Sequence, residues 1–142
     1  MSNYSNDNDL KVYEPGILEH LPVTTPPTTS FDAQHAEAKR ILDEIIIRRL
    51  PQGIKERVKR GEATMNDVVD ESDLKTVSVF YTLFVIFNRL STNKDDIFAV
   101  KASEYLELFK EKSADLSFDI STDNDADFDE EIDAGNIRIE RG

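Results

Sequence analysis

The sequence of 142 residues contains no cysteine and no tryptophan. Without cysteine the chain can form no disulfide, no thiolate nucleophile and no zinc–thiolate site. Cationic residues are also few, because 17 Lys and Arg stand against 29 Asp and Glu, giving a formal net charge of -12. A strongly acidic chain repels phosphate backbones and anionic lipid at long range. General affinity for nucleic acids or membranes is therefore not expected.

Long hydrophobic runs are missing as well. The longest, "VSVFYTLFVIF" at residues 77–87, has about half of the ~20 residues that a bilayer span requires. The N-terminus, "MSNYSNDNDLK", lacks a basic region followed by an apolar one, so no signal peptide is expected. These features predict a soluble cytosolic protein.

Residues that support catalysis are scarce. The only histidines are His20 and His35, and the five glycines form no phosphate-binding loop. No serine or threonine stands in a nucleophile-elbow pattern. Carboxylates are plentiful only because acidic residues are plentiful. We interpret both histidines as surface residues and expect neither an enzyme nor a cofactor.

Residues 1–29 are too apolar for a free linker but too interrupted for a long helix. Leu10, Ile17 and Leu18 alternate with Pro15-Gly16 and Pro22, and a stiff "TTPPTTS" connector follows. This pattern predicts an extended arm that lies on another surface.

Helical periodicity begins near Ser30 or Asp32, either of which can cap a helix. This first helix is expected to end at Pro51 and Gly53, and residues 54–60 could add one or two turns. Its apolar face has five members at helical spacing: Ala38, Ile41, Leu42, Ile45 and Ile46.

A second helix is predicted to start after Asp70 or Ser72 and to continue to about Leu90. The competing interpretation is a strand, because Val, Ile, Phe, Tyr and Thr are abundant. Residues 73–90 contain no Gly or Pro, and this length is unusual for one strand. An almost wholly apolar helix belongs in the centre of a bundle. Its aromatic residues are expected to form core rather than a ligand pocket: Phe80, Tyr81, Phe84 and Phe87.

A third helix is predicted after "STNKDD", where Thr92 and Asp95 have capping-box spacing. We expect it to fray near Ser113. Its apolar stripe has five members: Phe98, Ala102, Tyr105, Leu106 and Phe109.

The predicted fold class is therefore all-α, a small helical bundle of three main helices with extended N-terminal and C-terminal arms. The expected parts are an N-terminal arm at 1–29, a helical core at 30–114 and an acidic C-terminal arm at 115–142. A core of this size offers little surface on which to bury both arms. We expect the chain to complete its fold on neighbouring molecules.

The acidic stretch "DISTDNDADFDEEI" at residues 119–132 has spacing close to a twelve-residue calcium loop. Asn124 stands where such loops place glycine, and a register started at Asp123 fails. The alternative is a turn that satisfies its own carboxylates by hydrogen bonds to the backbone. The weak calcium candidates are Asp119, Asp123, Asp125, Asp127 and Glu130.

The chain has one basic cluster: Arg48, Arg49, Lys55, Arg57, Lys59 and Arg60. It could contact nucleic-acid phosphates, although no aromatic residues are interleaved for base stacking. It could pair with carboxylates of a neighbour, such as residues 115–133 of an adjacent copy. It could also be a solvated helix end. At the C-terminus, "NIRIERG" alternates apolar and charged residues and predicts a short strand.

The order of these motifs resembles the head–tail connector proteins of tailed bacteriophages, also called adaptor or head-completion proteins. The resemblance covers most of the chain. It is carried by "YEPGILEHLP", "FDAQHAEAKRILDEIIIRRL", "DESDLKTVSVFYTLFVIFNRLS" and "DDIFAVKASEYLELFKE", followed by the Asp-rich turn and "IRIERG".

The resemblance implies a small helical subunit of the virion neck, assembled in the host cytoplasm. Such subunits form a ring with copies of themselves, commonly of twelve, beneath the portal protein. The ring extends the DNA channel, lies close to DNA and contacts a tail or second neck protein. The implied portal-docking arm is residues 115–142, with a strand-like contact at Ile137, Arg138, Ile139, Glu140 and Arg141. Asn124 and Phe128 depart from the glycines common in the Asp-rich turn of relatives.

Two other classes of function remain open at this point. A cytosolic regulatory or calcium-responsive protein-binding module would be a stable monomer that responds to calcium. A DNA-binding regulator would need the basic cluster on an exposed recognition helix, with strongly salt-sensitive binding.

Overall fold

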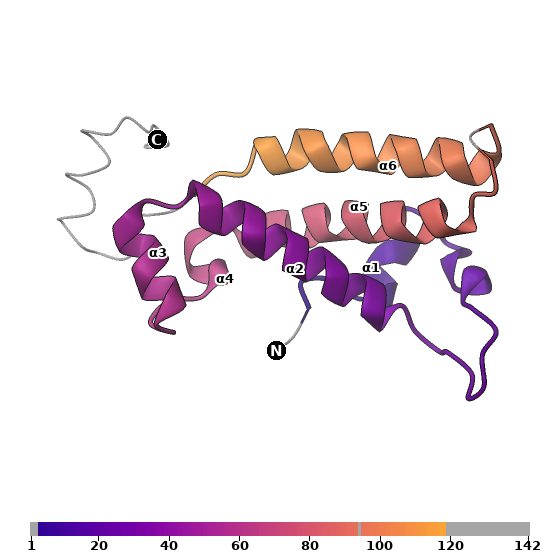
Figure 1. The fold of residues 1–142 in the computed structure, drawn as a ribbon, viewed down its shortest axis with the longest axis horizontal. Helices are drawn as coiled ribbons and strands as arrows, with labels where there is room; N and C mark the ends of the chain where they lie inside the picture. Colours follow the sequence, from indigo (N-terminus) through magenta and orange to yellow (C-terminus); the bar gives the residue numbers. More distant parts are fainter. Residues whose placement is uncertain (1–2, 94, 119–142) are drawn as a thin grey trace.

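The computed structural model describes residues 3–93 and 95–118, and these residues form helices joined by short loops (Figure 1). An all-α fold is therefore confirmed for the described chain. The elements are α1 (Asp7–Lys11), the 3-10 helix η1 (Ile17–His20), α2 (Asp32–Arg49), α3 (Gln52–Lys59), α4 (Met65–Val68), α5 (Glu71–Leu90) and α6 (Ile97–Ala114).

Helix α5 is the centre of the fold, because it packs against α6, α2 and α1. Leu74, Leu83 and Ile86 are fully buried, as expected for a helix that is covered on several sides. Its assignment as a helix rather than a strand is confirmed over the whole apolar run. Within the part of the chain that the structure describes, no helix combines the length and hydropathy needed to cross a membrane.

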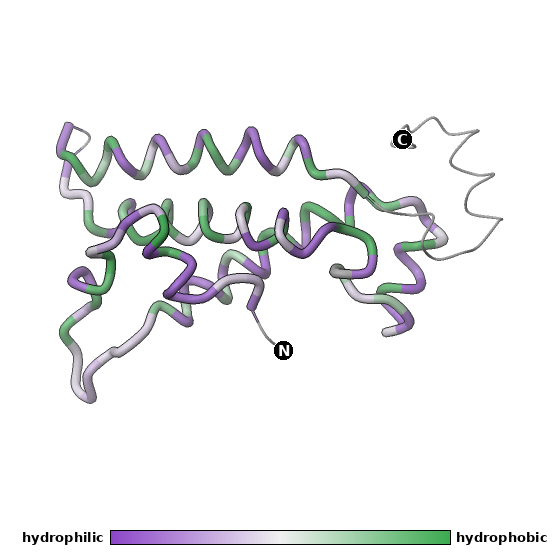
Figure 2. The backbone as a smooth tube through the Cα atoms, turned by 180° about the vertical axis from the view of Figure 1, so that it is seen from behind, coloured by the Kyte–Doolittle hydropathy of each residue, from purple (hydrophilic) through white to green (hydrophobic). Residues whose placement is uncertain are grey.

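Helix α6 runs beside α5 and packs its apolar stripe against it. Figure 2 shows hydrophobic and hydrophilic segments alternating along α6, as expected for an amphipathic helix. Ala102, Tyr105 and Phe109 are buried against α5, whereas Phe98 and Leu106 are partly buried.

The cap of α6 is not the predicted Thr92 with Asp95 but Asp96. The Asp96 carboxylate accepts hydrogen bonds from the backbone amides of Ala99 at 2.7 Å and Thr92 at 2.7 Å. These bonds stabilise the charged form and lower the pKa of Asp96 to about 2. The sequence contains two neighbouring aspartates, Asp95 and Asp96, and the path of the backbone before α6 decides that Asp96 is the cap.

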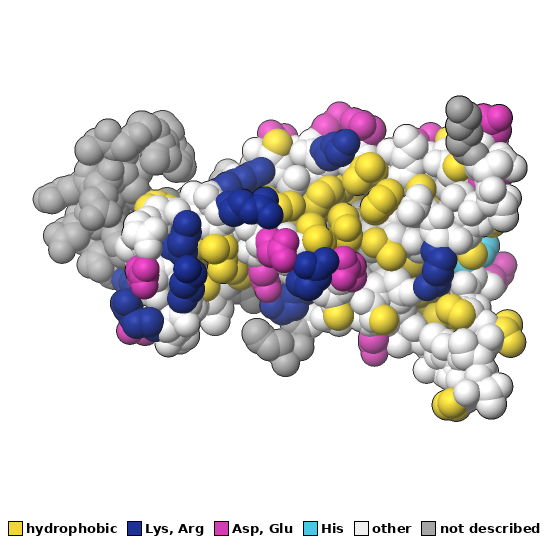
Figure 3. All heavy atoms as spheres, in the orientation of Figure 1, with side chains coloured by type: hydrophobic (Ala, Val, Ile, Leu, Met, Phe, Trp, Pro, Cys, Tyr) yellow, Lys and Arg dark blue, Asp and Glu magenta, His cyan; other side chains and the backbone are white. Residues whose placement is uncertain are grey.

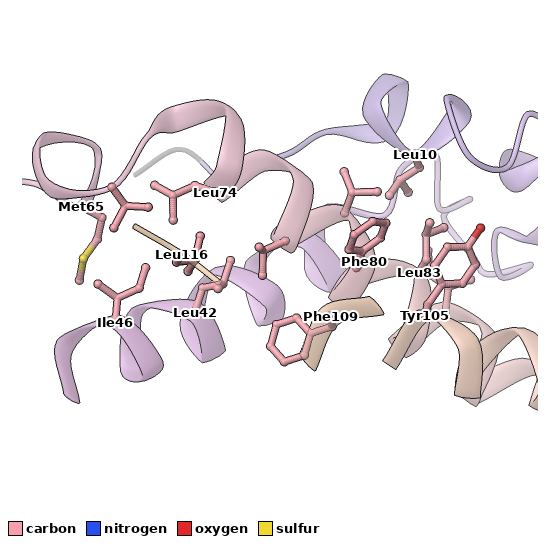
Figure 4. Packing of buried hydrophobic residues seen from close by; sticks show 14 of the residues in the cluster. Leu10, Leu42, Ile46, Met65, Leu74, Phe80, Leu83, Tyr105, Phe109 and Leu116 are labelled. Carbon is pink, nitrogen blue, oxygen red and sulfur yellow. The ribbon is translucent and has the colours of Figure 1, made fainter. Parts of the chain in front are cut away.

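The short helices α3 and α4 form one end of the molecule (Figure 1). Thr64 and Asp67 make a capping box that starts α4. Figure 4 shows Met65 and Leu116 near Leu42 and Ile46 of α2, so residues from three parts of the chain close this end of the core. Phe118 forms an isolated antiparallel bridge with Val69.

The N-terminal segment differs from the extended arm that was predicted. It contains α1 and η1, and its apolar residues Leu10 and Ile17 are buried on the chain's own helices, 0% and 1% exposed. Burying each such side chain stabilises by about 1.5–3 kcal/mol. The expectation that this segment needs a partner's surface is therefore wrong. Its turn residues fold it into short pieces that fit on α5.

Candidate functional site

A chain of buried polar groups connects the N-terminal segment to α2 and α5. The His35 ring lies between Ser5 and Asp7, with Nδ1 2.8 Å from the Ser5 hydroxyl and Nε2 3.0 Å from the Asp7 carboxylate. The Ser5 hydroxyl also lies 2.7 Å from that of Ser78 on α5. His35 is 0% exposed, so its interpretation as a surface residue is wrong.

The Asp7 carboxylate fixes the direction of the first of these hydrogen bonds. A carboxylate can only accept, so His35 Nε2 donates to Asp7. In the neutral ring Nδ1 then accepts from Ser5, which in turn accepts from Ser78. Asp7 also accepts from the backbone amide of Phe31 at 3.3 Å, immediately before α2. Asp7 therefore ties α1 to the start of α2.

Serine, histidine and aspartate in hydrogen-bonded order are also the constituents of a nucleophilic triad. A nucleophile must reach a substrate carbonyl, and here Ser5 is only 6% exposed and its hydroxyl faces both His35 and Ser78. The geometry suits positioning of the N-terminal segment. The buried site satisfies its own polar groups.

Two further contacts hold the same segment. Glu14 accepts hydrogen bonds from Lys101 at 2.8 Å and from the Tyr105 hydroxyl at 2.6 Å, so it bridges to α6. Burial, together with the bond to Glu14, raises the pKa of Tyr105. Tyr4 donates to Asp43 of α2, and burial likewise raises its pKa. Both phenols therefore remain neutral donors at physiological pH.

The predicted basic cluster lies at the end of the molecule formed by α3 and the last turn of α2. Figure 3 shows Lys and Arg side chains gathered over this end. Arg49 donates to the backbone oxygen of Ser113 at 2.6 Å, and Arg60 pairs with Glu62 at 2.9 Å. Arg48 is exposed, and its guanidinium lies 3.9 Å from the Glu44 carboxylate, which is a long distance for an ion pair. Lys55 and Lys59 form no ion pair with the residues that the structure describes.

The cluster is therefore divided between residues used inside the chain and residues available to a partner. Arg49 helps to join α2 to α6, and Arg57 on α3 also has an interaction within the chain. Arg48, Lys55 and Lys59 are the members that could contact another molecule. We call these three residues the basic edge.

The outward face of α6 carries the opposite charge. Glu104, Glu107 and Glu111 recur at helical spacing, are exposed, and form no ion pair with any described residue. Ile97, Val100 and Leu108 share this face and are 60%, 43% and 39% exposed. We call these six residues the acidic face. Sequence pattern alone did not reveal this face, because the buried stripe of the same helix is the stronger signal.

An apolar surface lies between α2 and α6 and is visible in the centre of Figure 3. Tyr81 and Phe84 of α5 are both partly buried, and the Tyr81 ring packs on Phe109 at 4.9 Å between ring centroids. Ile41 and Ile45 of α2 are also partly buried. The expectation that Tyr81 and Phe84 belong to the core is correct only in part, since both residues are partly rather than fully buried.

Two predicted sites lie outside the described residues. These are the calcium candidates from Asp119 to Glu130 and the docking contact from Ile137 to Arg141. Within residues 3–93 and 95–118, no group of three or more His, Asp or Glu side chains is arranged to hold a metal ion.

Comparisons of this chain with models of protein families, with curated proteins and with solved structures gave no match.

Proposed function

We propose that this protein is a structural subunit of the neck of a tailed bacteriophage virion. In this role copies of the chain form a ring that joins the portal to the tail and extends the DNA channel. The order of motifs along the sequence suggests the context, and the exposed charged surfaces of the folded domain suit repeated protein contacts.

The observation that carries the proposal is a closed helical core with separate acidic and basic surfaces. The core from Leu10 to Leu116 is buried within one chain. The acidic face and the basic edge nevertheless have no ionic partners among the described residues, apart from the long Arg48–Glu44 contact. Paired surfaces of opposite sign favour and orient protein–protein contacts.

The position of Phe118, the last residue that the structure describes, also supports this role. Leu116 is buried and Phe118 pairs with Val69, so residues 119–142 follow from a fixed point near the basic end of the domain. A fully extended segment of this length could reach about 80 Å. Such a segment could contact a portal protein while the helical domain remains in the ring.

The net charge of -12 fits a channel component. An acidic wall repels the phosphate backbone and so allows DNA to pass without adhering. The negative net charge also argues against a DNA-binding regulator. In addition, Arg49 and Arg60 of the basic cluster are already used in contacts within the chain.

The test is reconstitution of the full-length protein with the portal protein of its own phage, followed by electron microscopy. We expect a ring of this protein on the portal. The double substitution Ile137→Asp with Ile139→Asp should abolish binding. Val23→Asp, at a fully exposed position in the 21–31 loop, is the matched control and should bind normally.

Absence of a complex with the wild-type protein would refute the proposal. The regulatory alternative predicts instead a stable monomer that changes on calcium addition, which calorimetry measures directly. No heat at millimolar calcium would exclude a calcium-responsive module.

A further inference from the structure

The outward face of α6 and the edge formed by α2 and α3 are complementary in both charge and apolar pattern. We infer that the acidic face of one copy packs along α2 and the basic edge of a second copy. This inference rests on the proposed function, and it names the partner of the basic cluster: α6 of a neighbouring subunit rather than its C-terminal segment.

The acidic face has the properties of a covered helix face. Of the six large hydrophobic residues most exposed in the described chain, three lie there: Ile97, Val100 and Leu108. They are interspersed with carboxylates that lack ionic partners. Apolar residues gathered on one exposed face indicate a contact surface. The partner must then offer apolar side chains and cations together.

The α2 side of the same molecule offers both. Ile41 and Ile45 are partly buried and lie one turn apart, and Arg48 continues that row to an exposed position. Beyond the end of α2, Lys55 and Lys59 extend the positive charge along α3. An apolar section is thus followed by a basic section along the chain.

The order of these sections also determines direction. On α6, apolar Ile97 and Val100 come first, and the three glutamates follow with Leu108 among them. On α2, Ile41 precedes Arg48 by two helical turns, about 10 Å, which is the spacing of Val100 and Glu107. A parallel alignment therefore places apolar beside apolar and acid beside base. An antiparallel alignment would place the glutamates beside the isoleucines.

The fold makes the parallel alignment available to identical copies. In Figure 1, α2 and α6 run in the same direction, on either side of the antiparallel α5. Copies related by a small rotation keep these directions, so α6 of one can lie parallel to α2 of the next. The two surfaces differ, so the contact is head-to-tail and generates a ring or a filament rather than a closed dimer.

Charge reversal tests this contact in the full-length protein. One variant carries Glu104→Lys, Glu107→Lys and Glu111→Lys, and a second carries Arg48→Glu, Lys55→Glu and Lys59→Glu. Association is measured by sedimentation and native mass spectrometry at about 0.01 M ionic strength, where screening is weak. The wild type should form species larger than dimers. Each variant alone should associate at least about tenfold more weakly.

Mixing the two variants provides the decisive measurement. Each new surface is complementary to the other variant, so an equimolar mixture should regain assembly. A control variant carries Glu19→Lys, Asp32→Lys and Asp95→Lys at other exposed positions. Its change of charge equals that of the glutamate variant, and it should assemble as the wild type does. Circular dichroism confirms that each variant is folded.

Three results would overturn the inference: a wild type that is monomeric or stops at dimers, variants that assemble normally, or a mixture that fails to assemble. None of these results bears on whether the protein binds the portal. Conversely, wild-type assembly through these charges without a portal complex would refute the neck role and leave the contact in place.

Discussion

The α5–α6 pair and the N-terminal segment, residues 3–21, are attached to the domain by different interactions. Between α5 and α6 the contact is apolar, with the ring of Phe87 stacked on Tyr105 at 6.1 Å and on Phe98 at 6.0 Å. The N-terminal segment has two fully buried apolar anchors and further partly buried apolar residues, and it adds directional hydrogen bonds through Asp7 and Glu14. Apolar contacts are not directional, whereas the strength of a hydrogen bond depends on the distance and angle between donor and acceptor.

This difference suggests that the segment can detach locally while the paired helices stay folded. Regions with few buried apolar contacts open at lower free energy than the core. If the two regions are independent, a substitution in the N-terminal segment should leave the α5–α6 pair unaffected.

The largest effect is expected from Phe87→Ala. This side chain is 1% exposed, so its removal leaves a cavity between α5 and α6 and should lower the free energy of unfolding by about 3–5 kcal/mol. Chemical denaturation measures the change. Val23→Ala, at a fully exposed site, should leave stability unchanged. A loss below about 1 kcal/mol would show that the aromatic stack is not a main source of stability.

A smaller and more local effect is expected from Asp7→Ala. It leaves His35 Nε2 and the Phe31 amide without their acceptor, at a cost of about 1–2 kcal/mol. Hydrogen exchange should accelerate at the amides of Leu10, Tyr13 and Glu14 but not within α5 and α6. Asp32→Ala, on the exposed first turn of α2, serves as the control. Equal acceleration in both regions would show that they open together.

An opposite sign is expected from Thr82→Val on α5. Among the described residues, the Thr82 hydroxyl is buried without a hydrogen-bond partner. Valine has nearly the same shape and removes the unsatisfied group, so the free energy of unfolding should rise by up to about 1 kcal/mol. Thr76→Val is the comparison, because that hydroxyl donates to the backbone oxygen of Ser72. A destabilised Thr82→Val variant would indicate a partner, such as a buried water.

The smallest effect concerns Asp96, the cap of α6. Its pKa of about 2 lies below the usual aspartate value of about 3.9. Its contribution is therefore complete above pH 4 and is lost as pH falls toward 2. The difference in thermal midpoint between wild type and Asp96→Ala should shrink over this window. Titration by NMR with a midpoint near 4 would contradict the assigned cap.

Local pattern was sufficient for much of the fold. The spacing of Ala102, Tyr105 and Phe109 predicted the buried side of α6, and the absence of Gly and Pro in residues 73–90 predicted α5 as one helix. Pro51 marked the end of α2, since α2 stops at Arg49 and α3 begins at Gln52. Short α4 was missed, although Thr64 and Asp67 have capping-box spacing.

The candidate sites could be predicted only in part. A run of cations identified the region of the basic edge, but not which members were already bonded within the chain. Ser5 and His35 meet because the N-terminal segment lies against the start of α2, and no sequence pattern indicates contacts between residues so far apart. The acidic face could have been found by examining the polar side of the α6 periodicity as closely as its apolar side.

The sequence by itself determined the three long helices α2, α5 and α6, their buried stripes and the acidic character of the chain, because periodicity, breakers and composition act within a few residues. The tertiary structure alone decided where the N-terminal segment lies, which aspartate caps α6, and that the unpaired acids and bases lie on separate surfaces. Those outcomes depend on which side chains meet across long stretches of chain. Burial and packing, rather than local preference, select such contacts.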